Sequence, residues 1–152
     1  MTDLPNVDSA EFVLRSVLNR SDWVTITDYV GADLLEGTPR MLRGAFKFES
    51  DGPSVYRRVL FRLGHSAQHV AKRPDAYVFE FSVSVVRESD GFDVENSPVS
   101  EDTDVVGYAH SLVTYKVMPM TRKDPAVQQG FGAMRARIMA SARAVVIPPR
   151  AS

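Results

Sequence analysis

The alternation of apolar and polar residues predicts strands along most of the chain and a single helix near its C-terminal end. Segments rich in β-branched and aromatic residues indicate strands at residues 11–17, 22–30, 40–49, 54–64, 76–88 and 105–120. A helix over residues 9–18 is the alternative for the first segment. The connections LNRS and SDGP predict one hairpin between the first two strands and another between the third and fourth.

The last part of the chain has the periodicity of an amphipathic helix. Asp124 suits the N-cap and Pro125 the first helical turn, while Pro148-Pro149 ends the helix. The apolar residues between them follow spacings of 4, 3, 4, 4 and 3: Val127, Phe131, Met134, Ile138, Ala142 and Val145. These patterns predict an α+β fold, an antiparallel sheet with an N-terminal hairpin and a C-terminal helix, in a single domain of residues 1–152.

Three of the predicted strands have one apolar face and one mixed face. In residues 76–86 the apolar set is Tyr77, Phe79, Phe81, Val83 and Val85, and the opposite set is Val78, Glu80, Ser82 and Ser84. In residues 54–64, Tyr56, Arg58, Leu60 and Arg62 face away from Val55, Arg57, Val59, Phe61 and Leu63. Arg43 and Lys47 likewise oppose Leu42, Phe46 and Phe48. One helix covers only part of so wide an apolar face, which predicts that a second subunit covers the rest.

Charge divides the chain into an acidic segment and a basic remainder. Residues 87–105 contain seven acids and one base, which leaves 17 basic (18 less one) and 12 acidic (19 less seven) residues elsewhere, a formal charge of +5. Such a body can bind a polyanion, and a solvated acidic loop on a neutral domain is the alternative explanation. A connection of nineteen residues exceeds the usual length, which predicts a functional or mobile loop.

No residue pattern indicates catalysis, a metal site or a membrane segment. The chain has no cysteine and no apolar run long enough to span a bilayer. His65 and His69 lack a third ligand, and His110 is isolated in a strand. No serine lies in a nucleophile elbow, and the acids of residues 88–104 lack EF-hand spacing. We therefore expect a protein that is not an enzyme and has no cofactor.

The mixed face of the sheet instead indicates nucleic-acid binding. Guanidinium and ammonium groups bind phosphates, and an aromatic ring among them can stack on a base. The residues that carry this prediction are Arg43, Lys47, Tyr56, Arg58 and Arg62, with Thr114 and Lys116 in the last strand. An ordinary solvated sheet face with scattered charges is the alternative.

The order of the segments resembles the coat (capsid) proteins of single-stranded RNA bacteriophages of the levivirus type. The similar stretches are FVL and VTIT (12–14 and 24–27), RLGHSAQ and AYVFEFSV (62–68 and 76–83), and LVTYKVMPM and DPAVQQGFGAMRARIM (112–120 and 124–139). The resemblance covers most of the chain as architecture and weak local similarity. It implies a long loop before the last strand and a helix that crosses onto a partner subunit.

The resemblance also implies a function. Homodimers would form by edge-to-edge pairing of residues 112–120 and build an icosahedral shell, with residues 87–105 at the symmetry axes. The inner sheet face would package the single-stranded RNA genome and bind a translational-operator hairpin. The implied location is the virion, assembled in the host cytoplasm, without a membrane partner. The inward positions fall on Tyr56, Arg58, Leu60, Arg62, Val78 and Glu80.

Two arguments disagree about which face of the last strand meets RNA. Alignment with the family on Pro119 places Ser111, Val113 and Tyr115 inward. The polarity of the strand favours His110, Thr114 and Lys116, and we adopt this second set.

Two further functions fit the predicted elements. A helix-grip domain, of the cyclase or lipid-binding kind, wraps a sheet around a C-terminal helix and binds a small molecule between them. It would place polar groups beneath the helix, whereas a coat protein would place Arg43, Arg58 and Arg62 on the face away from it. A small host RNA-binding module would lack the large assembly.

Overall fold

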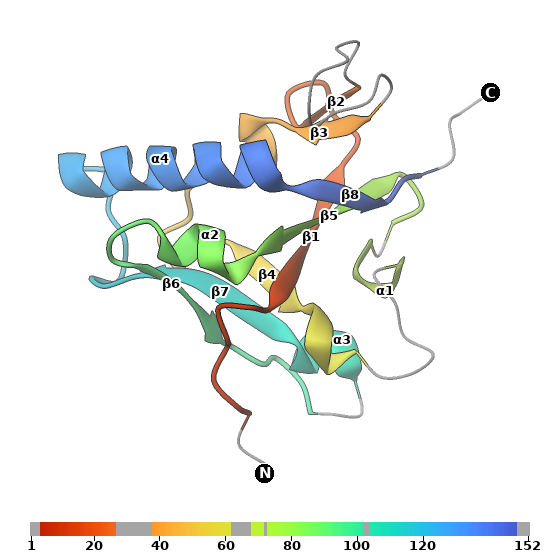
Figure 1. The fold of residues 1–152 in the computed structure, drawn as a ribbon, viewed down its shortest axis with the longest axis horizontal. Helices are drawn as coiled ribbons and strands as arrows, with labels where there is room; N and C mark the ends of the chain where they lie inside the picture. Colours follow the sequence, from red (N-terminus) through yellow and green to blue (C-terminus); the bar gives the residue numbers. More distant parts are fainter. Residues whose placement is uncertain (1–3, 27–37, 62–67, 72, 102–103, 149–152) are drawn as a thin grey trace.

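The protein is an α+β structure built on one antiparallel sheet. The computed structural model describes residues 4–26, 38–61, 68–71, 73–101 and 104–148. The sheet has six strands in the order β6-β7-β4-β1-β5-β8, and a separate pair, β2 and β3, forms a small hairpin (Figure 1). The strands are β1 (Phe12–Leu18), β2 (Val24–Ile26), β3 (Pro39–Met41), β4 (Ser54–Arg57), β5 (Ala76–Ser82), β6 (Phe92–Asn96), β7 (His110–Tyr115) and β8 (Arg143–Val146).

Among the described residues, the helices are short except for α4. They are η1 (Arg43–Ala45), η2 (Arg58–Leu60), α1 (Gln68–Ala71), α2 (Val83–Arg87), α3 (Val105–Tyr108) and α4 (Pro125–Ser141). Helix α4 begins as predicted, because the Asp124 carboxylate accepts a hydrogen bond from the Ala126 amide at 2.9 Å and Pro125 occupies the first turn. Its buried residues are Val127, Phe131, Met134 and Ile138, four of the predicted stripe.

The predicted C-terminal boundary of the helix is wrong. Helix α4 ends at Ser141, and the chain continues as strand β8 beside β5. Ala142 packs against the core that α4 covers, whereas Val145 packs against the cluster on the other face of the sheet. Residues 143–146 therefore pair with β5 as a strand, and the helix does not continue to Pro148-Pro149.

Both predicted hairpins are wrong. Strand β1 pairs with β4 and β5 and not with β2, whose partner among the described residues is β3. Residues 43–45 and 58–60, predicted as strand, form the 3₁₀ turns η1 and η2. Residues 83–87 form α2, because the Ser82 hydroxyl accepts a hydrogen bond from the Ser84 amide and begins a helix. The described residues of the acidic segment also contain strand β6, so this segment is not a continuous loop.

The face pattern predicted for residues 76–82 is confirmed. Tyr77, Phe79 and Phe81 belong to the larger core cluster, which includes the buried residues of α4. Ala76 and Val78 belong to a smaller cluster on the opposite face, together with Val70 and Ala71 of α1. Within the described residues the apolar face is covered by the chain's own α2, α4 and residues 45–46. It does not need a second subunit for cover.

Strand β7 is internal to the sheet. It pairs with β4 on one edge and with β6 on the other. Its edges are therefore not open for the edge-to-edge pairing that the coat-protein resemblance implies for residues 112–120. In the described part of the six-stranded sheet, the outermost strands are β6 and β8.

The turn before β4 depends on a glycine. Gly52 has φ +97°, and a Cβ atom there would lie 2.1 Å from the carbonyl oxygen of Val113. We expect Gly52→Ala to lower the free energy of unfolding by about 2 kcal/mol or more, because it adds backbone strain and a clash with β7. Gly132→Ala is the control, since its Cβ would meet no atom within 4 Å, and should stabilise α4 by up to about 1 kcal/mol. Urea denaturation compares the two, and equal effects would contradict this account of Gly52.

Candidate nucleic-acid interface

The structure does not bring the predicted RNA-binding residues together on one surface. Arg43 and Lys47 line a groove next to α4, whereas Tyr56 and Arg58 belong to β4 and η2. Thr114 and Lys116 lie in β7 and just after it, and Arg62 lies outside the described residues.

The side of the sheet that carries Tyr56 is polar along β7. Tyr56 lies directly opposite His110, and their rings meet edge to face at 5.5 Å. The His110 ring nitrogens lie 2.7 Å from the Ser97 carbonyl oxygen and 3.0 Å from the Ser54 hydroxyl. Val113 belongs to the core on the other side. Alternation therefore places His110 and Thr114 on the same side of the sheet as Tyr56, whereas Val113 lies on the side of the core; which side meets RNA stays a prediction.

Arg58 shares a buried carboxylate with a second arginine. Arg58 donates to Glu80 Oε2, and Arg143 Nη2 donates to Glu80 Oε1 at 2.8 Å. The Glu80 side chain is 2% exposed, whereas those of Arg58 and Arg143 are 56% and 72% exposed. Glu80 therefore neutralises part of the positive charge at the place where the sequence predicted a basic face.

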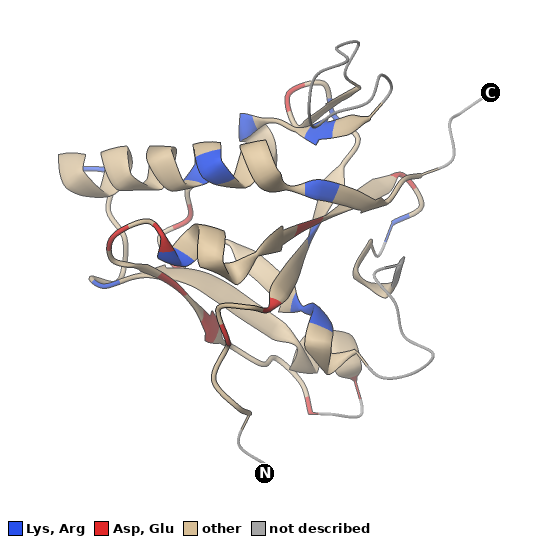
Figure 2. Cartoon of the chain, in the orientation of Figure 1, with Lys and Arg blue, Asp and Glu red and all other residues tan. Residues whose placement is uncertain are grey.

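The last two predicted residues do not form a basic surface either. The Thr114 side chain is buried, and Asp93 of β6 lies directly opposite it in the sheet. The Lys116 ammonium lies 4.0 Å from an Asp90 carboxylate oxygen. Figure 2 shows acidic positions on β6 and on the turn after α2, and basic positions on α4, β8 and the segment around η1.

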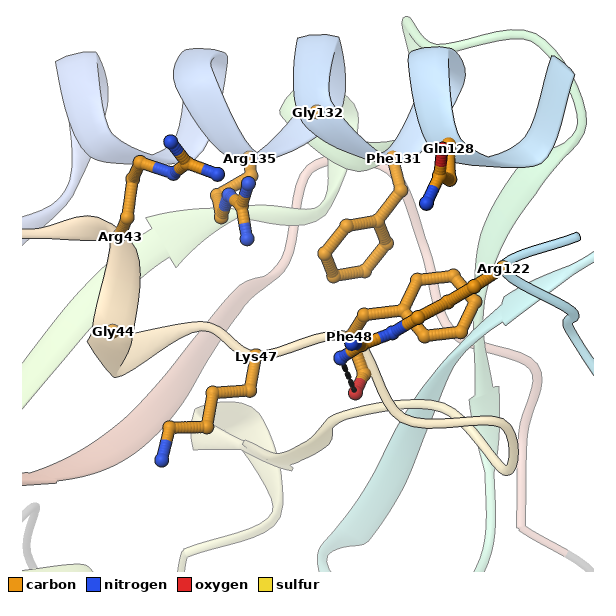
Figure 3. A pocket seen from close by; sticks show the side chains of 9 residues that line it. All are labelled: Arg43, Gly44, Lys47, Phe48, Arg122, Gln128, Phe131, Gly132 and Arg135. Atoms are coloured by element: carbon orange, nitrogen blue, oxygen red, sulfur yellow. Dashed lines mark hydrogen bonds between the residues drawn. The ribbon is translucent and has the colours of Figure 1, made fainter. Parts of the chain in front are cut away.

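Several positive charges gather between α4 and residues 43–48, in a hollow that we call the α4 groove. It has a volume of about 580 Å³. Its lining consists of Arg43, Gly44, Lys47, Phe48, Arg122, Gln128, Phe131, Gly132 and Arg135, so it includes four cations and no acid (Figure 3).

The side of the groove opposite α4 is held in place by β1 and the residues after it. Arg15 of β1 donates from Nε to the Ala45 carbonyl at 2.8 Å and from Nη1 to the Ser54 carbonyl at 2.7 Å. Burial lowers the pKa of Arg15, whose guanidinium donates these hydrogen bonds to backbone carbonyls. Gly44 packs so closely on Trp23 that a Cβ atom would lie 2.4 Å from the indole ring. These contacts fix the segment that carries Arg43 and Lys47.

Two arginines of the groove lie over aromatic rings. The Arg122 guanidinium lies 5.2 Å from the centre of the Phe48 ring, and that of Arg135 lies 5.5 Å from the centre of Phe131. Each donates one long hydrogen bond of 3.5 Å to a backbone carbonyl, Arg122 to Phe48 and Arg135 to Phe46. Lys47 points away from α4 in Figure 3, and its ammonium lies 4.6 Å from the centre of the Trp23 ring. Cation–π contacts of this kind position the side chains without cancelling their charge.

No carboxylate of the described residues forms an ion pair with the cations of the groove. Among the ion pairs of the described residues, none joins a carboxylate to Arg43, Lys47, Arg122 or Arg135. Burial lowers the pKa of Arg135, and the charges of Arg43 and Arg122 lower it further. Arginine stays protonated at physiological pH, so the repulsion among these groups opposes their clustering. A bound anion would remove that repulsion.

Sequence reasoning found Arg43 and Lys47 but missed Arg122, Gln128 and Arg135. The available signal was helical spacing, because Gln128 and Arg135 lie near Phe131 on the side of α4 that borders its buried stripe. Their meeting with Arg43 depends on how α4 packs, which no local pattern indicates.

Comparison with protein-family models, with curated proteins and with solved structures finds no match. In the described part of the chain no helix combines the length and hydropathy needed to cross a membrane. The same residues contain no group of three or more side chains suited to hold a metal ion.

Proposed function

We propose that this chain is a structural protein that binds single-stranded RNA and acts as an assembly of copies, of the coat-protein kind that its sequence resembles. The observation that carries the RNA part is the α4 groove, which is lined by three arginines and Lys47 and by no acid. The groove lies beside the helix and not on the sheet face that the resemblance implies for RNA. Guanidinium groups bind phosphate through parallel hydrogen bonds, and clusters of them are typical of polyanion sites.

The assembly part of the proposal rests on the sequence resemblance. An antiparallel sheet with a C-terminal amphipathic helix is compatible with it. The implied dimer seam along residues 112–120 needs revision, because both edges of β7 are occupied. In the described part of the six-stranded sheet, the edge strands through which copies could associate are β6 and β8.

A second candidate function is the binding of a small phosphorylated molecule by a helix-grip type of domain. The position of Arg43 favours it, since this residue lies beneath α4 and not on the face away from the helix. The groove volume of about 580 Å³ also falls within the usual range of small-molecule pockets.

Expression followed by size-exclusion chromatography separates these functions. We expect particles far larger than a dimer whose ultraviolet absorbance shows co-purified RNA. A monomer free of nucleic acid would contradict the proposal and leave the small-ligand function. Large particles without RNA would contradict the RNA part alone.

A paired substitution tests whether the groove carries the RNA contacts. Arg43→Gln with Arg135→Gln should weaken RNA binding at least tenfold, because charge-assisted hydrogen bonds contribute about 1.5–3 kcal/mol each. The slope of log affinity against log salt should fall by about 1.4 for two lost phosphate contacts on a single strand.

The control for this test is Arg58→Gln with Arg143→Gln, which removes the two exposed arginines that share the buried Glu80 carboxylate. Because this leaves Glu80 without a counter-charge, urea denaturation first checks that the control remains folded under the binding conditions. Titration of RNA at several salt concentrations measures both double variants. If the control loses more affinity than the groove variant, the RNA interface lies on the Glu80 side of the sheet.

A further inference from the structure

The shape of the α4 groove limits what can enter it. Helix α4 forms one side and residues 43–48 the other, so backbone borders the hollow on two sides. A folded RNA helix displays its phosphates on the outside of a wide, rigid cylinder, and proteins read it mainly by contacts across its minor groove. An unpaired strand can place single nucleotides into a narrow hollow.

The two ends of the groove differ in chemistry. Arg43 and Arg135 lie next to each other at one end, and Figure 3 draws Arg122, Phe48 and Gln128 at the other. Arg43 is exposed and has no carboxylate partner among the described residues. Arg135 uses one nitrogen for its single long hydrogen bond to the Phe46 carbonyl. Since a guanidinium has five N–H donors, most donors at this end remain available to a phosphate.

The opposite end offers a flat surface and a neutral polar group. The Arg122 guanidinium is held over the Phe48 ring, and unpaired bases stack on guanidinium planes as well as on aromatic rings. Gln128 is exposed, its side chain points into the groove in Figure 3, and its amide has no hydrogen-bond partner among the described residues. A carboxamide both donates and accepts, which suits the edge of a base and adds nothing to phosphate binding by charge.

We infer that the α4 groove holds one unpaired nucleotide of a single-stranded RNA. The phosphate lies on Arg43 and Arg135, the base stacks against Arg122, and Gln128 hydrogen-bonds the edge of the base. This inference rests on the proposed function, because it specifies which form of RNA the groove accepts. It also places the site beside α4, on the opposite side of the sheet from Tyr56 and Arg58.

Fluorescence anisotropy on the full chain tests the inference. The probes are labelled single-stranded oligoadenylate, oligouridylate and oligocytidylate of about ten nucleotides, and a blunt RNA duplex of the same length. We expect the tightest single strand to bind at least tenfold more tightly than the duplex. Equal affinities for single strand and duplex would overturn the inference and leave the proposed function standing.

Three variants separate the roles within the groove. Gln128→Ala should change the ratio of affinities among the three oligonucleotides by about threefold or more, since a base contact is lost. Arg43→Gln should weaken all three by a similar factor, because phosphate contacts carry no sequence information. Gln129→Ala is the control, an exposed neighbour on α4 that does not line the groove. Gln129→Ala should change neither the three affinities nor the ratios among them.

Two other results would contradict the inference, and a third would contradict the proposed function. If Gln128→Ala leaves every ratio unchanged, the base does not occupy the predicted end of the groove and the inference fails. If inorganic phosphate at equal charge concentration displaces the oligonucleotides completely, the groove is a phosphate site without a base contact, and the inference also fails. If none of the RNAs binds, the proposed function itself is wrong.

Discussion

Replacing Arg57 with methionine is expected to lower the free energy of unfolding by about 3–5 kcal/mol, one of the two largest effects of a single substitution. Arg57 is 2% exposed and lies at the end of β4. Its Nε and Nη2 donate to the two carboxylate oxygens of Glu11 at 2.8 Å, and Nη1 donates to the Pro5 carbonyl and to Asn96 Oδ1, each also at 2.8 Å. Methionine would fill the volume but leave the Glu11 carboxylate, whose side chain is 10% exposed, without a counter-charge.

Denaturant titration of the wild type and three variants measures this effect. Arg73→Met removes an arginine from an exposed pair with Asp75 and should cost no more than about 1 kcal/mol. The double variant Arg57→Met with Glu11→Leu should recover much of the lost stability, because no unpaired charge remains buried. A loss below about 1 kcal/mol for Arg57→Met alone would show that Glu11 is solvated, contrary to its position in the structure.

Phe131→Ala should also destabilise the protein by about 3–5 kcal/mol, because it opens a cavity where α4 meets the sheet. The Phe131 ring stacks on Phe46 with centroids 5.8 Å apart and meets Phe48 edge to face at 5.2 Å. Its ring centroid also lies 6.3 Å from that of Phe92 in β6. One aromatic side chain thus connects α4 to residues 46–48 and to the edge of the sheet.

Thermal and denaturant unfolding of Phe131→Ala and Phe131→Leu checks this role. Leucine retains much of the buried volume, so its loss should be smaller than that of alanine. Phe131 also supports the Arg135 guanidinium in the α4 groove. We therefore expect RNA affinity to fall in both variants at temperatures where they remain folded. Equal stability of the wild type and the alanine variant would contradict the packing described for α4.

The two faces of strand β5 followed from the sequence, but the partners of the strands did not. Strict alternation in residues 76–82 placed Tyr77 and Phe79 on one side and Val78 on the other, as the two core clusters confirm. The predicted hairpins failed because β1 pairs with β4 and β5, which follow it by tens of residues. Which strands pair depends on the burial of the whole sheet, and short turn signals such as LNRS do not decide it.

For the predicted RNA-binding residues, the sequence likewise indicated which side chains share a side of the sheet but not what surrounds them. Alternation correctly grouped Tyr56 with His110 and Thr114, yet it gave no indication that Thr114 is buried or that Glu80 binds Arg58 and Arg143. The predicted strand was also too long. Strand β4 ends at Arg57, and Arg58 lies in the 3₁₀ turn η2, where side chains no longer alternate between two faces.

The sequence by itself determined the local features of this protein: an α+β composition, the start and buried stripe of α4, and the inward and outward sets along β5. These features depend on residues within a few positions of one another, whose periodicity sets which side chains share a face. Only the tertiary structure decided that Arg43, Arg122 and Arg135 line one groove. Residues from such distant parts of the chain meet because α4 buries its apolar stripe against the sheet, and that packing carries the neighbouring arginines toward residues 43–48.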